Sequence, residues 1–128
     1  MRLLLDTHAC LWFVGGDERL STRARQLIED TGNQPLLSVA SLWEMAIKIS
    51  LGKLTLDPPF ATFIPQHLRL NGIQLLNIEF RHTVRVAELP FHHRDPFDRL
   101  LVAQALTEDL PLLSGDPNFD AYGVARWW

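Results

Sequence analysis

Three consecutive leucines, Leu3, Leu4 and Leu5, lie near the start of the chain and are followed directly by Asp6. A strand with one face in water alternates apolar and polar residues, whereas an unbroken apolar run is typical of a strand covered on both faces. Such strands occur in parallel sheets, whose ligands bind beyond the carboxyl ends of the strands. Asp6 is therefore predicted to lie at a binding edge. An ionised carboxylate there needs a metal ion or a hydrogen-bond partner.

Strand-like and helix-like patterns alternate along the rest of the chain. Further short apolar runs predict strands at 35–38, 73–77, 110–114 and, at the edge of the sheet, 124–128. Helical patterns, several of them ending at glycine, predict helices at 7–14, 21–29, 41–50, 60–70, 81–89 and 97–107. Pro65 either kinks its helix or marks where that helix truly begins. The alternation predicts a single domain over residues 1–128, with a three-layer α/β/α fold around a mostly parallel sheet.

Composition restricts the class of protein. With 128 residues, 47% of them hydrophobic and 21% charged, the chain is expected to form one ordinary globular domain. Cys10 is the single cysteine, which excludes a disulfide framework and a thiolate metal cluster, and we expect it to be a buried core residue. A reducing, cytosolic setting fits best, without a membrane span or signal peptide. The net charge of −3 argues against a protein that holds nucleic acid through its overall charge.

Three further acids, Glu44, Asp98 and Asp116, follow loops or apolar runs as Asp6 does. Each has a purely structural interpretation. Ser41 and Glu44 match a capping box, and Asp116 could form a turn after a strand.

Asp98 could simply favour a helix start after Pro96, and Asp95 could be the N-cap of that helix. Asp6 has the weakest structural explanation, because Thr7 could cap the next helix.

Taken together, the acids predict a metal site. Strand ends and the helix starts that follow them gather on one edge of a parallel sheet, where four carboxylates would repel one another unless cations lay between them. Oxygen ligands suit Mg²⁺ or Mn²⁺, and such a site can bind a phosphodiester and activate a water. A zinc site is not expected: His92 and His93 are adjacent and would not project to one point, and His8 and His67 have no partner at ligand spacing.

Four segments together resemble the PIN domain, and more narrowly the VapC-type toxins of bacterial toxin–antitoxin pairs. They read Leu-Leu-Leu-Asp6-Thr-His, Ser-Val-Ala-Ser-Leu-Trp-Glu44-Met-Ala-Ile-Lys48, Arg-Asp-Pro-Phe-Asp98-Arg-Leu-Leu-Val-Ala-Gln-Ala105 and Leu-Leu-Ser114-Gly-Asp116-Pro-Asn-Phe119. The likeness covers essentially the whole chain. It implies a metal-dependent ribonuclease with a sheet of four or five strands, a small antitoxin as partner, and a homodimer.

The resemblance also assigns residues. Asp6, Glu44, Asp98 and Asp116 match the acidic quartet of the family, and Ser114 matches the hydroxyl near the fourth acid. Asp98 is preferred to Asp95 as the third acid, because the apolar helix motif follows Asp98 at the family's spacing.

The sequence thus predicts an endoribonuclease toxin that uses Mg²⁺ or Mn²⁺, with Asp6, Glu44 and Asp98 at the principal metal and Asp116 at a second site or orienting the water. Lys48 and Arg99 are candidates for phosphate contacts or solvated surface residues. The tryptophans at 12, 43, 127 and 128 supply core and dimer surface.

Two other functions are compatible with parts of the pattern. A phosphoacceptor signalling domain would need paired acids after its first strand and a lysine after its fifth, which the chain does not have. A catalytically inactive PIN-like binding module would keep the fold alone. Under the toxin interpretation, we expect the antitoxin to insert an arginine or lysine among the acids and to hold an apolar groove formed by residues 11–13 or the helix of Trp43.

Overall fold

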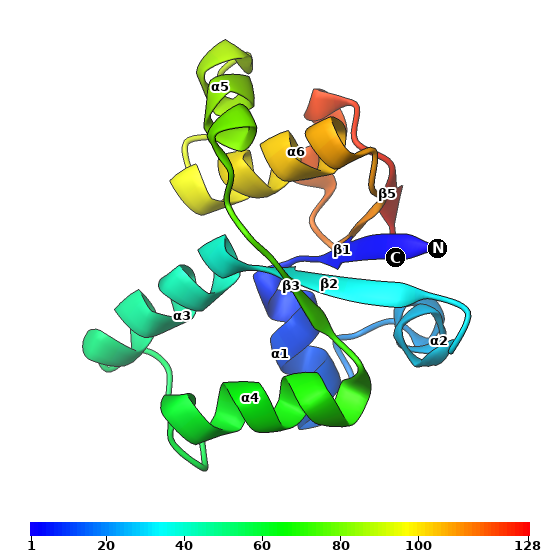
Figure 1. The fold of residues 1–128 in the computed structure, drawn as a ribbon, viewed down its shortest axis with the longest axis vertical. Coiled ribbons are helices and arrows are strands. Elements are labelled where there is room, and N and C mark those ends of the chain that lie inside the picture. Colours follow the sequence, from blue (N-terminus) through cyan, green and yellow to red (C-terminus); the bar gives the residue numbers. More distant parts are fainter.

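The leucine run forms the central strand of the sheet in the computed structural model, which describes residues 1–128 (Figure 1). Five strands, all parallel, lie in the order β3-β2-β1-β4-β5. Their bounds are β1 (Arg2–Leu5), β2 (Gln34–Ser38), β3 (Gln74–Leu76), β4 (Leu112–Leu113) and β5 (Arg126–Trp127). The predicted α/β class, the parallel sheet and the edge position of the last strand are confirmed.

Helices cover both faces of the sheet. They are α1 (Thr7–Gly15), α2 (Thr22–Glu29), α3 (Val39–Ser50), α4 (Phe60–Asn71), α5 (Phe80–Glu88), α6 (Pro96–Glu108) and the 3₁₀ helix η1 (Pro117–Tyr122). Every predicted helix is present, while η1 was not predicted. Pro65 lies inside α4, which begins at Phe60, so the interpretation of Pro65 as the helix start is wrong. None of the helices is both long and apolar enough to cross a membrane.

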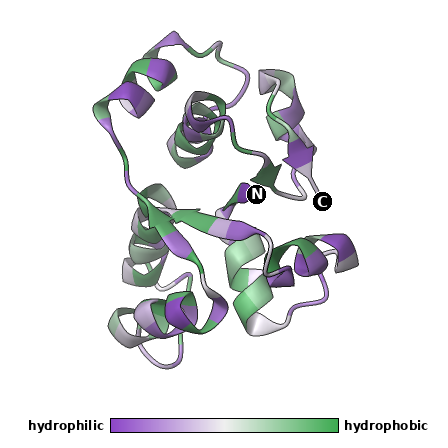
Figure 2. Ribbon diagram, turned by 45° about the vertical axis from the view of Figure 1, so that its right-hand side comes forward, coloured by the Kyte–Doolittle hydropathy of each residue, from purple (hydrophilic) through white to green (hydrophobic).

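Two hydrophobic cores explain why the leucine run does not alternate. Leu3 and Leu5 pack with residues of α1, α2, α3 and α4 on one side of the sheet. Leu4 packs with α6 and η1 on the other side. Successive side chains of a strand point to opposite faces, so a strand between two cores must be apolar throughout. In Figure 2 the central strands are coloured mostly as hydrophobic, while hydrophobic and hydrophilic residues alternate in most of the helices.

Two helix starts differ from the sequence interpretation. Asp6, rather than Thr7, is the N-cap of α1 and accepts a hydrogen bond from the Ala9 N–H at 2.6 Å. Ser38, rather than Ser41, is the N-cap of α3, and it accepts from Ala40. The capping-box interpretation of Glu44 is therefore wrong, because Ser41 already lies inside the helix.

Cys10 is a core residue, as predicted. It is 4% exposed, and burial raises the pKa of its thiol to about 12, with a smaller contribution from the charge of Asp6. A thiol with such a pKa is not a nucleophile near neutral pH. Trp127 and Trp128 are half-buried against the core formed with Leu3 and Leu5, so the expected packing of the C-terminal tryptophans is observed.

Candidate active site

The carboxyl ends of β1, β2 and β4 meet the beginnings of α1, α3 and α6 at one edge of the sheet (Figure 1). A cavity of about 160 Å³ lies there. Its lining consists of Asp6, Thr7, His8, Glu44, Lys48, Asp95, Asp98, Asp116 and Phe119. The structure therefore brings together all of the acids that were singled out in the sequence.

Asp6 is fixed by its position as a helix cap. Its carboxylate accepts from the Ala9 N–H, and the residue as a whole is only 8% exposed. Burial raises the pKa of Asp6, although hydrogen bonds from the Ser114 side chain and the Ala9 N–H partly offset this effect. Ser114 in turn accepts from the backbone N–H of Asp116 at 3.1 Å. The hydroxyl thus links the ends of β1 and β4.

Asp98 lies in the first turn of α6, whose N-cap is Asp95. The Asp95 carboxylate accepts from the N–H groups of Phe97 and Asp98, which gives it the structural role that the sequence offered as one option. The pKa of Asp98 is raised to about 7, first by burial and then by the charges of Asp95, Glu44, Asp6 and Asp116. Asp98 thus experiences the combined negative charge of the cavity.

Glu44 points back from α3 toward the start of α1. The Thr7 hydroxyl lies 2.7 Å from Glu44 Oε1 and 2.8 Å from Ser41 Oγ. A carboxylate only accepts and a hydroxyl carries one hydrogen, so Thr7 donates to Glu44 and accepts from Ser41. On the other oxygen, Lys48 Nζ lies 3.1 Å from Oε2. Lys48 is the one lysine or arginine in the lining of the cavity.

His93 is a residue that the sequence interpretation missed. Its Nδ1 accepts from the Asp95 N–H at 3.1 Å, so in the neutral ring the hydrogen is on Nε2, which lies 3.4 Å from Asp98 Oδ2. Ligand atoms of His93, Asp98 and Asp116 all lie within 4.8 Å of one another. From the sequence alone, the histidines are candidates only for a zinc site. The signal in the sequence was the position of His93 two residues before a helix N-cap.

Arg99 does not contact the cavity. It is 7% exposed, and its guanidinium donates to the carbonyls of Pro90 at 3.0 Å and Val86 at 3.1 Å. A third hydrogen bond, at 3.3 Å, reaches the hydroxyl of Tyr122. Both earlier options for Arg99, a phosphate contact and a solvated surface residue, are therefore wrong.

The donor set fits a hard divalent cation. Five carboxylates line a small cavity with one lysine, and the charges of the other four add to the burial that raises the pKa of Asp98. Carboxylate oxygens are preferred by Mg²⁺ and Mn²⁺.

Comparisons with known proteins agree with this geometry. A sequence model of the PIN domain matches residues 3–125. Ribonuclease VapC16 of Mycobacterium tuberculosis is 41% identical over 59 residues, a match that covers 46% of this chain and 42% of that protein. The chain therefore matches less than half the length of this curated relative.

Two solved structures share the fold. VapBC2 from Rickettsia felis, crystallised with a DNA fragment from its promoter, superposes with a TM-score of 0.73 at 15% identity, covering 99% of this chain and 98% of the other. A toxin–antitoxin complex from Klebsiella pneumoniae superposes with a TM-score of 0.66 at 17% identity, covering 98% and 96%.

Proposed function

This chain belongs to the PIN-domain family, and we propose that it is a divalent-metal-dependent endoribonuclease and the toxin of a toxin–antitoxin pair. The observation that carries the proposal is the convergence of five carboxylates, the four predicted ones and Asp95, on one cavity with a single lysine to balance them. The similarity to ribonuclease VapC16 supports RNA as the substrate.

In this proposal Asp6, Glu44 and Asp98 hold the principal cation, while Asp116 completes a second, weaker site or orients the attacking water. A bound Mg²⁺ or Mn²⁺ ion supplies charge neutralisation at the phosphodiester and activation of a water. His93 cannot act as a general base through Nδ1, because this atom already accepts from the Asp95 N–H.

The neighbouring hydroxyls hold the carboxylates in place before the substrate arrives. Thr7, backed by Ser41, fixes the orientation of Glu44, and Ser114 fixes that of Asp6. Such prior positioning reduces the cost of reorganisation when charge develops on the phosphate. Lys48 lies at the same cavity and can attract the phosphodiester once cations neutralise Glu44.

A groove beside the acidic cavity suits the antitoxin. It has a volume of about 640 Å³, and its apolar lining includes Leu11, Trp12 and Phe63. His8 and Lys48 line both the groove and the acidic cavity, so a segment bound in the groove could place an arginine or lysine among the carboxylates. Leu11 and Trp12 match the groove expected from the sequence. The helix of Trp43 contributes only Lys48 to it.

Exposed apolar side chains gather where β3 leads into α5 and suit a homodimer contact. Leu75 is 44% exposed, Ile78 37%, Phe80 83% and Val84 39%. Phe80 and Val84 are four residues apart on one helix and share a face.

Cleavage of a mixed RNA pool by the purified protein tests the nuclease. We expect products with Mg²⁺ or Mn²⁺, none with a chelator, and strong loss in Asp98→Asn. Glu88→Gln, which removes an exposed acid of α5, is the matched control and should cleave normally. A folded wild-type protein that leaves RNA intact with either metal would support the inactive binding module instead.

Expression in bacteria tests the toxin. The wild-type chain should arrest growth and Asp98→Asn should not. Co-expression with a small neighbouring gene should restore growth. A chain that is harmless when expressed alone, with its fold and nuclease activity intact, would remove the toxin role and leave the enzyme.

A further inference from the structure

We propose that a second cavity, beside the acidic one and lined by His8, Trp12, Arg19 and Trp128, binds an unpaired nucleobase of the RNA strand being cut. The inference rests on the proposed ribonuclease function and adds a subsite to it.

The position of this cavity ties it to the carboxylates. It has a volume of about 390 Å³ and lies beyond the carboxyl ends of β1, β4 and β5. Asp6, His8 and Asp116 line both cavities. A strand with one phosphodiester at the acids therefore has this cavity beside it, within reach of the adjacent nucleotide.

Aromatic rings form much of its wall. His8 and Trp12 are four residues apart on α1, with ring centroids 5.5 Å apart and planes inclined by 30°. The indole of Trp128 meets that of Trp12 edge to face, with centroids 6.1 Å apart. Nucleobases stack on aromatic side chains whatever their sequence, because every base has a π face.

Gly115 allows Trp128 to take this position. A Cβ atom at residue 115 would lie 3.0 Å from Cζ2 of the Trp128 indole and 2.9 Å from Cε2, and the second distance is shorter than real Cβ contacts. Any larger residue at this position would force the indole to shift. The glycine between Ser114 and Asp116 therefore has a role in shaping the cavity.

Arg19 supplies a positioned positive charge. Asp17 accepts from its Nε at 3.1 Å and its Nη2 at 2.7 Å, and the guanidinium carbon lies 4.9 Å from the centre of the Trp12 ring. Nη1 makes no hydrogen bond within the protein, so it can donate to a phosphate or to a base edge. An aromatic wall with one available guanidinium donor suits a nucleotide better than a purely apolar ligand.

A base that is paired in a duplex cannot enter this cavity. The subsite therefore predicts cleavage in single strands and loops, with stacking rather than base-edge reading as the main interaction.

The test uses single-stranded RNA oligonucleotides in which one abasic nucleotide is moved stepwise across the cleavage position. In the wild-type protein, an abasic nucleotide at one position should raise KM by roughly 5- to 150-fold, which is the range expected for one stacked base. Trp128→Ala should raise KM for the intact RNA and lose the abasic penalty in that register. Trp128→Phe should retain it, and Arg69→Gln, at an exposed arginine of α4, should resemble the wild type. An equal penalty in Trp128→Ala would overturn the proposal.

Binding measurements separate this inference from the nuclease itself. The Kd of the same RNAs is measured in Ca²⁺ with Asp98→Asn protein, alone and combined with Trp128→Ala or Arg19→Gln. Abasic-sensitive binding without any cleavage by the wild type would support the subsite while the nuclease proposal fails. Cleavage with no position-specific penalty would overturn the subsite and leave the nuclease standing. If Trp128→Ala leaves RNA binding unchanged but releases a co-expressed protein partner, the cavity belongs to that partner and the proposal is overturned.

Discussion

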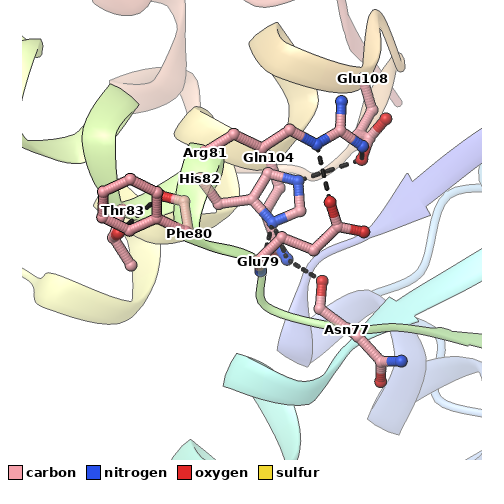
Figure 3. A network of polar contacts seen from close by, with 8 residues as sticks. All are labelled: Asn77, Glu79, Phe80, Arg81, His82, Thr83, Gln104 and Glu108. Carbon is pink, nitrogen blue, oxygen red and sulfur yellow. Dashed lines mark hydrogen bonds and ion pairs between the residues drawn. The ribbon is translucent and has the colours of Figure 1, made fainter.

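Glu79 and Glu108 meet His82 and Arg81 where α5 packs against α6 (Figure 3). At the carboxyl ends of the strands, the acids of the candidate active site meet His93. Each place holds three side chains whose ligand atoms lie within 4.8 Å of one another, namely Glu79, His82 and Glu108 in one and His93, Asp98 and Asp116 in the other. By proximity alone both could hold a metal ion. Their hydrogen bonds and charges separate them.

In the cluster on α5 and α6, the polar and charged groups find their hydrogen-bond and ion-pair partners within the cluster. His82 is fully buried; its Nδ1 accepts from the Glu79 N–H, so Nε2 carries the hydrogen and donates to Glu108 at 3.0 Å. Arg81 contacts both glutamates, as Figure 3 shows. Burial alone raises the pKa of Glu108, but the hydrogen bonds from His82 and Arg81 outweigh it and lower that pKa. His82, like His93, has no lone pair left for a metal, so the charges of the carboxylates and not the histidines separate the two clusters.

The acidic cavity has no such compensation. Its one lysine pairs with Glu44, and the pKa of Asp98 is raised to about 7. A cluster of acids whose charge is not balanced lowers the stability of the fold, and is retained where it has a function. A cluster whose charges are paired contributes to stability. The comparison teaches that charge balance, rather than ligand distance, distinguishes the candidate metal site from the structural cluster.

The largest expected effect is on catalysis. Asp98→Asn should lower RNA cleavage at least about 100-fold, the scale on which losing one electrostatic contact in a transition state is felt. Without metal it should also raise Tm, because one repelling charge is gone. Glu108→Gln should leave cleavage within about twofold of wild type. Rates at matched protein and Mn²⁺ concentrations, with thermal melts, decide this. Equal losses in both variants would abolish the distinction between the two clusters.

The pH dependence of stability should reveal Asp98 in metal-free protein. Its folded pKa of about 7 lies above the ordinary value of 3.8, so the folded state binds the proton more tightly. Its contribution to stability is therefore complete below pH 3.8 and is lost as the pH rises through 7, by an amount on the order of a few kcal/mol. Melts of wild type and Asp98→Asn between pH 5 and 8 should converge at the acid end and diverge at the alkaline end. Parallel curves would refute the raised pKa.

Metal should stabilise only the uncompensated cluster. A cation that binds the native state stabilises it by mass action, about 2.7 kcal/mol at 100 times its Kd. Millimolar Mg²⁺ or Mn²⁺ should therefore raise Tm in the wild type and in Glu108→Gln, and much less in Asp6→Asn. Ca²⁺ should also raise Tm while supporting cleavage poorly. A Tm that changes with neither Mg²⁺ nor Mn²⁺ would argue strongly against a carboxylate metal site.

Glu108→Ala should destabilise the fold and spare the chemistry. It leaves the buried Nε2–H of His82 without an acceptor, which costs about 1–3 kcal/mol. Urea unfolding measures the free energy, with Glu88→Ala as the exposed control, and cleavage per folded molecule should be unchanged. Loss of metal-induced stabilisation in Glu108→Ala would show that the two clusters are coupled.

Most of the fold could be predicted from the sequence because the apolar patterns of its strands and helices extend over many residues. The leucine run and the apolar helices specify a parallel sheet between two cores, and parallel topology then brings strand ends and helix starts to one edge. The convergence of Asp6, Glu44, Asp98 and Asp116 followed from topology without knowledge of any side-chain contact.

Finer features could not be predicted, because they depend on the conformation of single residues. Asp6 and Thr7 are both good N-caps, and the backbone of one residue decides which of them begins the helix. Arg99 is buried because α6 is packed on most sides, whereas the sequence predicts a phosphate contact or a solvated surface residue. The loop that brings His93 to Asp98 has no periodic pattern to indicate its path.

The smallest effect is expected from Arg81→Gln. This variant tests whether the ion pairs of Arg81 or the hydrogen bond of His82 contributes more to the stability of the cluster on α5 and α6. Arg81 is 53% exposed in its side chain, and water screens its ion pairs with Glu79 and Glu108, so their loss should lower the free energy of unfolding only slightly. The hydrogen bond from buried His82 to Glu108 remains in this variant, and it should hold the cluster together. Urea unfolding at low and high salt measures the effect, and the difference from wild type should shrink as salt screens the ion pairs. A loss as large as that of Glu108→Ala, unchanged by salt, would show that Arg81 rather than His82 maintains the cluster.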